Sequence, residues 1–259
     1  MAALVSTKLL GNRFSRMVNK FLTIQKKIRL GLFSCLCFCC ATTSSTALGV
    51  NFTERAYFYE DGSGLFSLEV DLTKSAKLIA FLKYLNKSYQ DIPKLIAYNP
   101  LCTLQKTLNP ITGITGIIVK NDKKSMLRFK LKFGFKDIEA LNKAMIKINE
   151  GLDPPEITYF NFSNELFVRE DLNGIVKKLI DYQNHSNCLI KSFDLASFFK
   201  HTTYTTIYTF HKMIKNYSNP LGELSKDKKT VRITHYVFAA DETEDSIGNR
   251  CHFDTSTQH

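Results

Sequence analysis

Apolar and polar residues alternate clearly over residues 55–72, in two runs separated by a stretch rich in glycine. The run "RAYFY" at 55–59 is β-prone, and "LFSLEVDL" at 65–72 places Phe66, Leu68 and Val70 on the side opposite its polar residues. Between the two runs stands "EDGSG", in which an Asp-Gly pair and a second glycine provide the backbone freedom that a tight reversal needs. The pattern predicts a β-hairpin with Asp61, Gly62 and Gly64 as its structural turn.

A helix is expected directly after this hairpin. Thr73 is a suitable N-cap, and apolar residues then recur at spacings of three and four: Leu78, Phe81, Leu82, Leu85 and Tyr89. The first part of the folded chain is therefore predicted to be strand, turn, strand and helix.

The same order of elements recurs twice downstream. Residues 116–135 predict a second hairpin, whose last run alternates apolar residues with Arg128, Lys130, Lys132 and Gly134. Residues 136–151 predict a helix with Asp137 near its start and Gly151 as its stop. A shorter hairpin over 157–168 and a helix over 171–182 complete a threefold rhythm.

Two further strands are predicted near the end of the chain, over 201–213 and 229–239. Hairpins alternating with helices, without a crossover signature, predict an α+β fold. We expect a largely antiparallel sheet built from repeated hairpin and helix units, with the helices on one face. Residues 52–240 would form this single domain, and residues 241–259, with five acidic residues and one arginine, are expected to form an acidic flexible tail.

The formal net charge of +11 suggests an anionic partner until the charge is located along the chain. Residues 1–29 contain seven basic residues and no acidic residue, so the other 230 residues carry a balance of only +4. Most of the basicity thus belongs to the N-terminal segment. We expect no nucleic-acid partner.

The N-terminal segment is typical of a secretory signal. A basic stretch ends at Arg29, the apolar run "LGLFSCLCFCCA" covers 30–41, and small polar residues follow. Ser45 and Ala47 suit a signal peptidase, which places cleavage after Ala47 and makes residues 1–47 the leader. The apolar run is shorter than the roughly 20 residues that span a bilayer, although an uncleaved anchor remains the alternative because no charge occurs between Arg29 and Glu54.

Four of the seven cysteines lie inside this apolar run: Cys35, Cys37, Cys39 and Cys40. A leader offers no folded scaffold for a metal site, so we expect no metal there. Lipid modification is the other interpretation, with Cys35 and Cys40 as candidates in a lipoprotein signal. The three remaining cysteines, Cys102, Cys188 and Cys251, are widely spaced and predict no disulfide framework.

Motifs for catalysis or for a cofactor are not found. Counted from Asp61, the twelfth position of a calcium loop is Leu72 instead of an acid, and the serine of "EDGSG" lacks the spacing of a hydrolase elbow. His235 shares strand parity with Val231 and Ile233, which predicts a partly buried, hydrogen-bonded histidine. We therefore expect no cofactor and no metal, and we name no catalytic residue.

The candidate binding surface is the basic stripe formed by Arg128, Lys130 and Lys132. Three like charges on one face of a strand are unfavourable unless solvent or an anionic partner faces them. Because the opposite face is wholly apolar and must be core, an ordinary solvated outer face is the favoured explanation of the stripe.

The segments "YFYEDGSGLFSLEVDL", "FGFKDIEALNKAM" and "LSKDKKTVRI" occur in an order and spacing similar to those of a group of uncharacterised exported and lipid-anchored proteins of Bacteroidetes bacteria. The resemblance covers residues 52–240, and its most specific element is the Asp-Gly-Ser-Gly turn together with the later Phe-Lys-Asp and Leu-Asn-Lys pattern. It implies export and a lipid anchor, and it brings no activity with it.

These observations support two functional hypotheses. The first is an exported, non-enzymatic binding or interaction module of a bacterial envelope, in the outer membrane, in the periplasm or secreted, with membrane lipid or another envelope protein as partner. The second is an exported hydrolase whose site forms only in three dimensions, which a deep pocket with two carboxylates, or His235 beside a carboxylate and a hydroxyl, would favour.

Overall fold

The computed structural model describes residues 49–80 except 78, 99–122, 127–149, 158–170, 201–237 and 247–254. The leader, Cys35, Cys40, most of the first predicted helix and the helix predicted over 171–182 lie outside these ranges.

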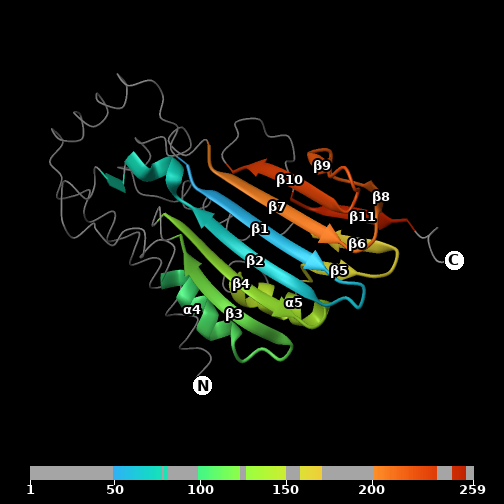
Figure 1. The fold of residues 1–259 in the computed structure, drawn as a ribbon, viewed down its shortest axis with the longest axis horizontal. Coiled ribbons are helices and arrows are strands. Elements are labelled where there is room, and N and C mark those ends of the chain that lie inside the picture. The colour runs from blue at the N-terminus through green and yellow to red at the C-terminus, as the bar shows by residue number, and fades with distance from the viewer. Residues whose placement is uncertain are drawn as a thin grey trace, which may run out of the picture. The chain divides into compact units, whose positions relative to one another are not determined.

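Two β-sheets dominate the described part of the chain (Figure 1). The larger has seven strands in the order β3-β4-β2-β1-β7-β10-β9, and the smaller has four in the order β5-β6-β11-β8. The strands of the large sheet are β1 (Asn51–Phe58), β2 (Gly64–Asp71), β3 (Ile114–Asn121), β4 (Arg128–Phe135), β7 (Thr203–Phe210), β9 (Gly222–Leu224) and β10 (Thr230–Tyr236). Those of the small sheet are β5 (Phe160–Phe162), β6 (Leu166–Arg169), β8 (Ile214–Tyr217) and β11 (Asn249–Phe253). The helical elements are η1 (Thr73–Ser75), α4 (Asn99–Leu108) and α5 (Ile138–Ile148).

Strand pairing in the large sheet is antiparallel at every interface except one. β1 pairs with β2 in the antiparallel hairpin, and on its other side it pairs with β7 in parallel, with Asn51 opposite Thr203 and Phe58 opposite Phe210. The fold is therefore a mixed α+β fold with a large, mainly antiparallel sheet, as the alternation predicted.

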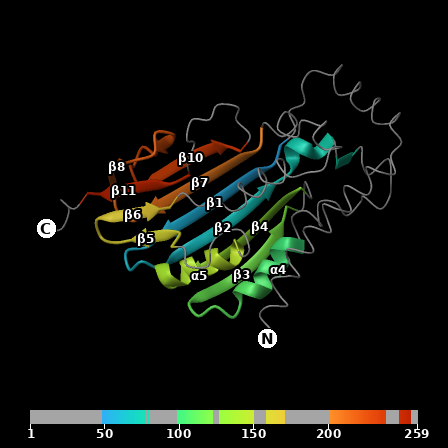
Figure 2. The same cartoon turned by 180° about the vertical axis from the view of Figure 1, so that it is seen from behind.

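The inner face of the large sheet carries the core. Alternate residues of β4 are buried there, Phe129, Leu131, Phe133 and Phe135, while Arg128 and Lys132 point to the opposite face. Helices α4 and α5 pack against β3 and β4. Next to them the small sheet packs over β1 and β7, where the ring of Phe58 lies 5.1 Å from that of Phe167 and 5.4 Å from that of Phe210. Figure 2 shows α5 and the β5–β6 hairpin in front of the large sheet from this side.

Helix α5 starts where the sequence predicted. Asp137 adopts an extended conformation and accepts a 2.8 Å hydrogen bond from the backbone N–H of Ala140, which is N-cap geometry. Ala140, Leu141, Ala144 and Met145 are buried on its inner side.

The repeated hairpin and helix units are not confirmed. The third hairpin, β5–β6, belongs to the small sheet instead of extending the large one. Helices also do not cover the inner face alone, because the small sheet covers its β1 and β7 part. The physical reason is that β5 and β6 bury aromatic rings, and these pack against Phe58 and Phe210.

The flexible tail expected over 241–259 is wrong for residues 249–253. These residues form β11, with Cys251 and Phe253 buried, and β11 lies between β6 and β8 in the small sheet. The alternation of "NRCHF" was present in the sequence, but the acidic residues before it masked the signal.

Candidate functional site: the outer face of the large sheet

The outer face of the large sheet is the face that does not carry the core. The strand registers arrange its side chains in rows that run across the strands. In one row Lys132 stands opposite Ser67, Ser67 opposite Arg55, Arg55 beside Ile207, and Ile207 opposite Arg232. We call Arg55, Lys132 and Arg232 the basic row. All three side chains are exposed.

The three residues of the predicted basic stripe, Arg128, Lys130 and Lys132, have different neighbours on β2. Arg128 donates from Nε to Asp71 at 3.0 Å, and Lys130 lies 3.9 Å from Glu69. Lys132 faces Ser67 instead of an acid. Within the described part of the chain, none of the three residues of the basic row forms an ion pair, and only Arg232 has an acidic residue, Glu223, opposite it on the next strand.

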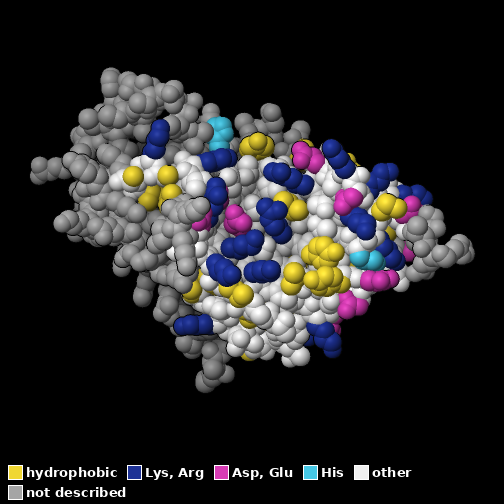
Figure 3. All heavy atoms as spheres, in the orientation of Figure 1, with side chains coloured by type: hydrophobic (Ala, Val, Ile, Leu, Met, Phe, Trp, Pro, Cys, Tyr) yellow, Lys and Arg dark blue, Asp and Glu magenta, His cyan; other side chains and the backbone are white. Residues whose placement is uncertain are grey.

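Figure 3 shows this face, with Lys and Arg side chains gathered over its middle. Sequence reasoning found Lys132 but missed Arg55 and Arg232. Each of these is the only lysine or arginine on its own strand, so only the pairing of β1, β7 and β10 brings them into one row. The stripe along β4 was visible because it lies within one segment.

Beside the basic row lies an exposed apolar group. Tyr57 on β1 stands directly opposite Leu65 on β2. This pair lies two residues closer to the turn than the pair of Arg55 and Ser67. The rings of Tyr57 and Tyr59 lie 4.9 Å apart. We call Tyr57, Tyr59 and Leu65 the apolar corner; hydrophobic side chains adjoin the basic ones in Figure 3.

The predicted turn residues connect these strands. Gly62 has φ of +79°, and its N–H donates to the carbonyl of Tyr59 at 3.2 Å. Asp61 accepts hydrogen bonds from the backbone N–H of Ser63 at 3.0 Å and from its hydroxyl at 2.6 Å. The hydroxyl of Ser63 holds the pKa of Asp61 below its ordinary value. Both of these hydrogen bonds are accepted by Oδ1 and lie within the turn.

A buried polar cluster lies on the inner face, formed by Glu54 (β1), Arg169 (β6), Tyr204 and Tyr208 (β7). The hydroxyls of Tyr204 and Tyr208 donate to the Glu54 carboxylate at 2.7 and 2.6 Å, and Arg169 Nε lies 3.4 Å from it. Arg169 also donates to the carbonyl of Glu170 at 2.6 Å. The guanidinium lies 5.1 Å from the centre of the Phe160 ring.

The burial of this cluster sets its protonation. Burial by itself lowers the pKa of Arg169, but Glu54, Tyr208 and Tyr204 together outweigh burial and raise the pKa above its ordinary value. Burial and the same carboxylate raise the pKa of both Tyr204 and Tyr208. The cluster is therefore a charged pair with two neutral phenols, and it joins the small sheet to the large one.

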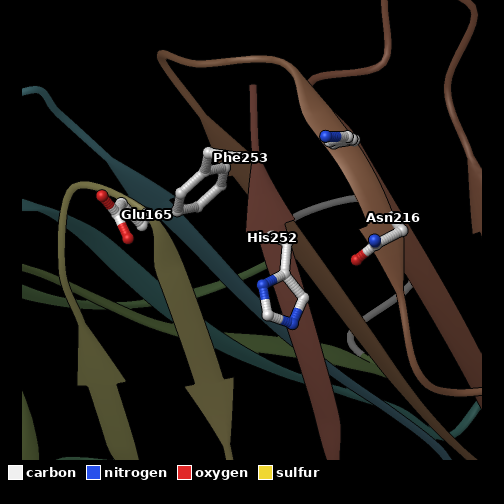
Figure 4. A pocket seen from close by; sticks show the side chains of 5 residues that line it. Glu165, Asn216, His252 and Phe253 are labelled. Carbon is white, nitrogen blue, oxygen red and sulfur yellow. The ribbon is translucent and has the colours of Figure 1, made fainter. Parts of the chain in front are cut away.

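Two shallow hollows lie elsewhere on the described surface. One, of about 250 Å³, is lined by Glu165, Lys215, Asn216, His252 and Phe253, and His252 lies between Glu165 and Asn216 (Figure 4). The other, of about 490 Å³, runs between α5 and β5 and contains Glu139 as its acid. Neither places two carboxylates together, which is one of the two arrangements that would favour the hydrolase hypothesis.

The remaining candidates are placed as follows. His235 is half-buried and stands opposite Tyr204 on the inner face. Among the described residues no three His, Cys, Asp or Glu side chains come together as metal ligands. No described helix has the length and apolar character needed to cross a membrane. Cys102 and Cys251 are free thiols.

The fold and this face together define a class: an α+β protein with a large, mainly antiparallel sheet that carries a basic row on its open face. No family model matches the chain, no curated protein matches its sequence, and the resemblance to the Bacteroidetes group thus has no family match behind it. Among solved structures, the chain is similar to the NMR structure of the folded domain of LppM from Mycobacterium tuberculosis. The identity is 8%, the match covers 82% of this chain and 96% of that chain, and the TM-score is 0.34. A likeness at this TM-score carries no argument about this chain.

Proposed function

We propose that this chain is an exported, non-enzymatic interaction module of a bacterial envelope that binds an anionic partner through the outer face of its large sheet. The observation that carries the proposal is the basic row. Arg55, Lys132 and Arg232 lie on three different strands and share one face, and none is neutralised by an ion pair with a described residue.

Charge complementarity supports an anionic partner. Arg128 and Lys130 already have carboxylates beside them, and such exposed pairs contribute only about 0–1 kcal/mol each. Within the described strands, Arg55 and Lys132 have no carboxylate opposite them, and Arg232 faces Glu223 without an ion pair, so the mutual repulsion of the row is relieved when negative charges of a partner face it. Alternate strands of a sheet are about 10 Å apart. The row therefore suits a partner with several spaced charges better than a single small anion.

The N-terminal leader supplies the location in this proposal. A basic stretch, an apolar run and small residues before Leu48 are the features of an export signal. Attachment through Cys35 or Cys40 would hold the domain at a membrane, whereas cleavage after Ala47 would release it. The intact mass and N-terminal residue of the native protein distinguish these outcomes, and an unprocessed Met1 start would overturn the exported location.

The binding surface is tested by neutralising the row. In the triple variant R55Q/K132Q/R232Q, three contacts worth about 1 kcal/mol each at an anionic surface are lost. We expect on the order of a hundredfold weaker binding to immobilised heparin and to phosphatidylglycerol vesicles at 0.1 M salt. Wild-type binding should also weaken at 0.5 M salt because exposed charges are screened.

The matched control is K143Q/K215Q/R250Q, which removes the same charge from α5, β8 and β11. These residues are exposed and lie away from the outer face. The control should bind like the wild type. Equal losses in both triple variants, or no binding of the wild type to either probe, would overturn the proposal.

A further inference from the structure

The apolar corner is the exposed feature that charge alone does not explain. Tyr57 is 39% exposed, Tyr59 42% and Leu65 37%. A lone exposed apolar residue is ordinary, but here three lie together, and Tyr57 and Leu65 form a cross-strand pair.

The corner adjoins the basic row on the same face. Two residues along a strand correspond to roughly 7 Å, so Arg55 precedes Tyr57, and Ser67 follows Leu65, by about that distance. Of the two rows beyond the basic row, one pairs Arg128 with Asp71, and in the other Lys130 pairs with Glu69 while Lys120 stands opposite Lys130. The basic row and the exposed apolar corner therefore occupy neighbouring rows of the outer face.

Building on the proposed function, we propose that the anionic partner is a phospholipid bilayer, with the apolar corner entering its headgroup layer and the basic row on the lipid phosphates. A soluble polyanion can pair with the basic row, but it provides no apolar environment that would bury Tyr57 and Leu65. A bilayer surface satisfies both, because tyrosine rings are stable at the boundary between headgroups and acyl chains and basic side chains pair with anionic lipids.

The hairpin turn limits how this docking occurs. Glu60 and Asp61 are exposed beside Tyr59, and carboxylates are repelled by an anionic membrane. Entry by the tip of the turn is therefore unfavourable, whereas approach by the outer face presents the corner and the row together. The penetration is shallow, since only three side chains take part.

The chain contains no tryptophan, so one substitution introduces a unique fluorophore. The test compares L65W with L221W, because Leu65 is 37% exposed and Leu221 is 38% exposed. Leu221 lies just before β9, the edge strand on the far side of the sheet. Each variant is mixed with phosphatidylglycerol vesicles whose acyl chains carry bromine, and with phosphatidylcholine vesicles.

We expect the emission of L65W to shift to shorter wavelength and to be quenched on anionic vesicles, while that of L221W stays unchanged. On phosphatidylcholine vesicles neither variant should respond. In the variant Y57S/L65S, vesicle binding should fall roughly tenfold or more because the buried apolar surface is lost, with heparin binding and the thermal midpoint unchanged.

The outcomes separate this inference from the proposed function. If L65W binds heparin and vesicles through the basic row but its emission is unquenched, the face is a polyanion-binding surface and the bilayer inference fails alone. Equal quenching of L221W would assign the membrane contact to another part of the chain and also overturn the inference. Absence of binding to both probes would remove the proposed function itself.

Discussion

The hydroxyl of Tyr208 on β7 donates a 2.6 Å hydrogen bond to Oε1 of Glu54 on β1, and neither residue has any exposed surface. The two strands are adjacent and parallel, although more than 150 positions separate the residues in sequence. Arg169 completes the cluster from the small sheet. A buried carboxylate is tolerated here because a guanidinium and two phenols compensate its lost hydration.

Removing the cation should therefore be costly. R169M keeps an apolar side chain of similar length but leaves Glu54 buried without its counter-charge. We expect the free energy of unfolding to fall by about 3–5 kcal/mol, measured by urea denaturation.

The double variant E54Q/R169M is the control for this effect. Because no unpaired charge remains, it should be more stable than R169M alone, which gives a favourable coupling in the double-mutant cycle. A loss below about 1 kcal/mol for R169M would mean that water reaches the pair and that the cluster is not closed.

Alkaline pH should destabilise the fold through Cys251. Burial raises the pKa of this thiol from 9.0 to about 12. The unfolded chain therefore loses its proton first as pH rises, so stability is complete below pH 9.0 and declines between pH 9.0 and about 12. The contribution is up to about 1.4 kcal/mol per pH unit.

The variant C251V isolates that contribution, because Tyr204 and Tyr208, whose raised pKa acts in the same direction above pH 10, remain in both proteins. Between pH 9.0 and about 12, the slope of unfolding free energy against pH should be shallower in C251V by up to about 1.4 kcal/mol per pH unit, which corresponds to the release of one proton. Identical slopes would show that the thiol is hydrated in the folded state.

Gly64 is expected to tolerate no side chain. A Cβ there would lie 2.0 Å from the carbonyl oxygen of Tyr57 and 2.4 Å from Cζ of Phe135. G64A should lower the unfolding free energy by about 3 kcal/mol or more, since both neighbours belong to paired strands and cannot retreat.

Gly116 gives a comparison of a different kind. Its φ is +59°, but a Cβ would meet nothing within 4 Å. G116A should cost only about 1 kcal/mol of backbone strain. Thermal or urea unfolding that ranks G116A as the more damaging change would contradict the packing around Gly64.

Asn142 should hold the edge of the small sheet. Its Oδ1 accepts from the backbone N–H groups of Tyr159 at 3.0 Å and Phe160 at 2.8 Å, and its Nδ2 donates to the carbonyl of Phe160 at 2.8 Å. N142A removes these three hydrogen bonds and should cost about 1–3 kcal/mol. Hydrogen exchange at the two amides should accelerate.

N142D is the informative partner variant, because it keeps the acceptor and loses the donor. Protection of the two amides should survive in N142D and disappear in N142A. If both amides stay protected in N142A, the attachment of β5 to α5 rests on packing instead.

The elements that were predictable are those whose signals are local. The turn after β1 follows from Asp61 and Gly62, the alternation of β4 follows from its buried phenylalanines, and the start of α5 follows from Asp137. Each depends on residues within a few positions, where backbone conformation and side-chain spacing decide the outcome. The α+β class follows from these elements together.

Several features were decided only by tertiary structure. The parallel pairing of β1 with β7, the basic row over β4, β1 and β10, and the buried cluster each join segments that are far apart in sequence. The alternation within one strand predicts which of its faces is buried, but it does not identify the neighbouring strand in the sheet. β11 was missed because acidic residues precede its short alternation, and its pairing with β6 and β8 also joins segments that are distant in sequence.

The amino-acid sequence by itself thus determined the local elements and the side of each strand that must be buried. Tertiary structure alone decided which charges share the outer face and which lie paired in the core. The physical reason is that the alternation of apolar and polar residues depends only on residues close in sequence. Strand order, by contrast, results from packing of the whole core, in which the ring of Phe58 contacts rings from β4, β5, β6 and β7.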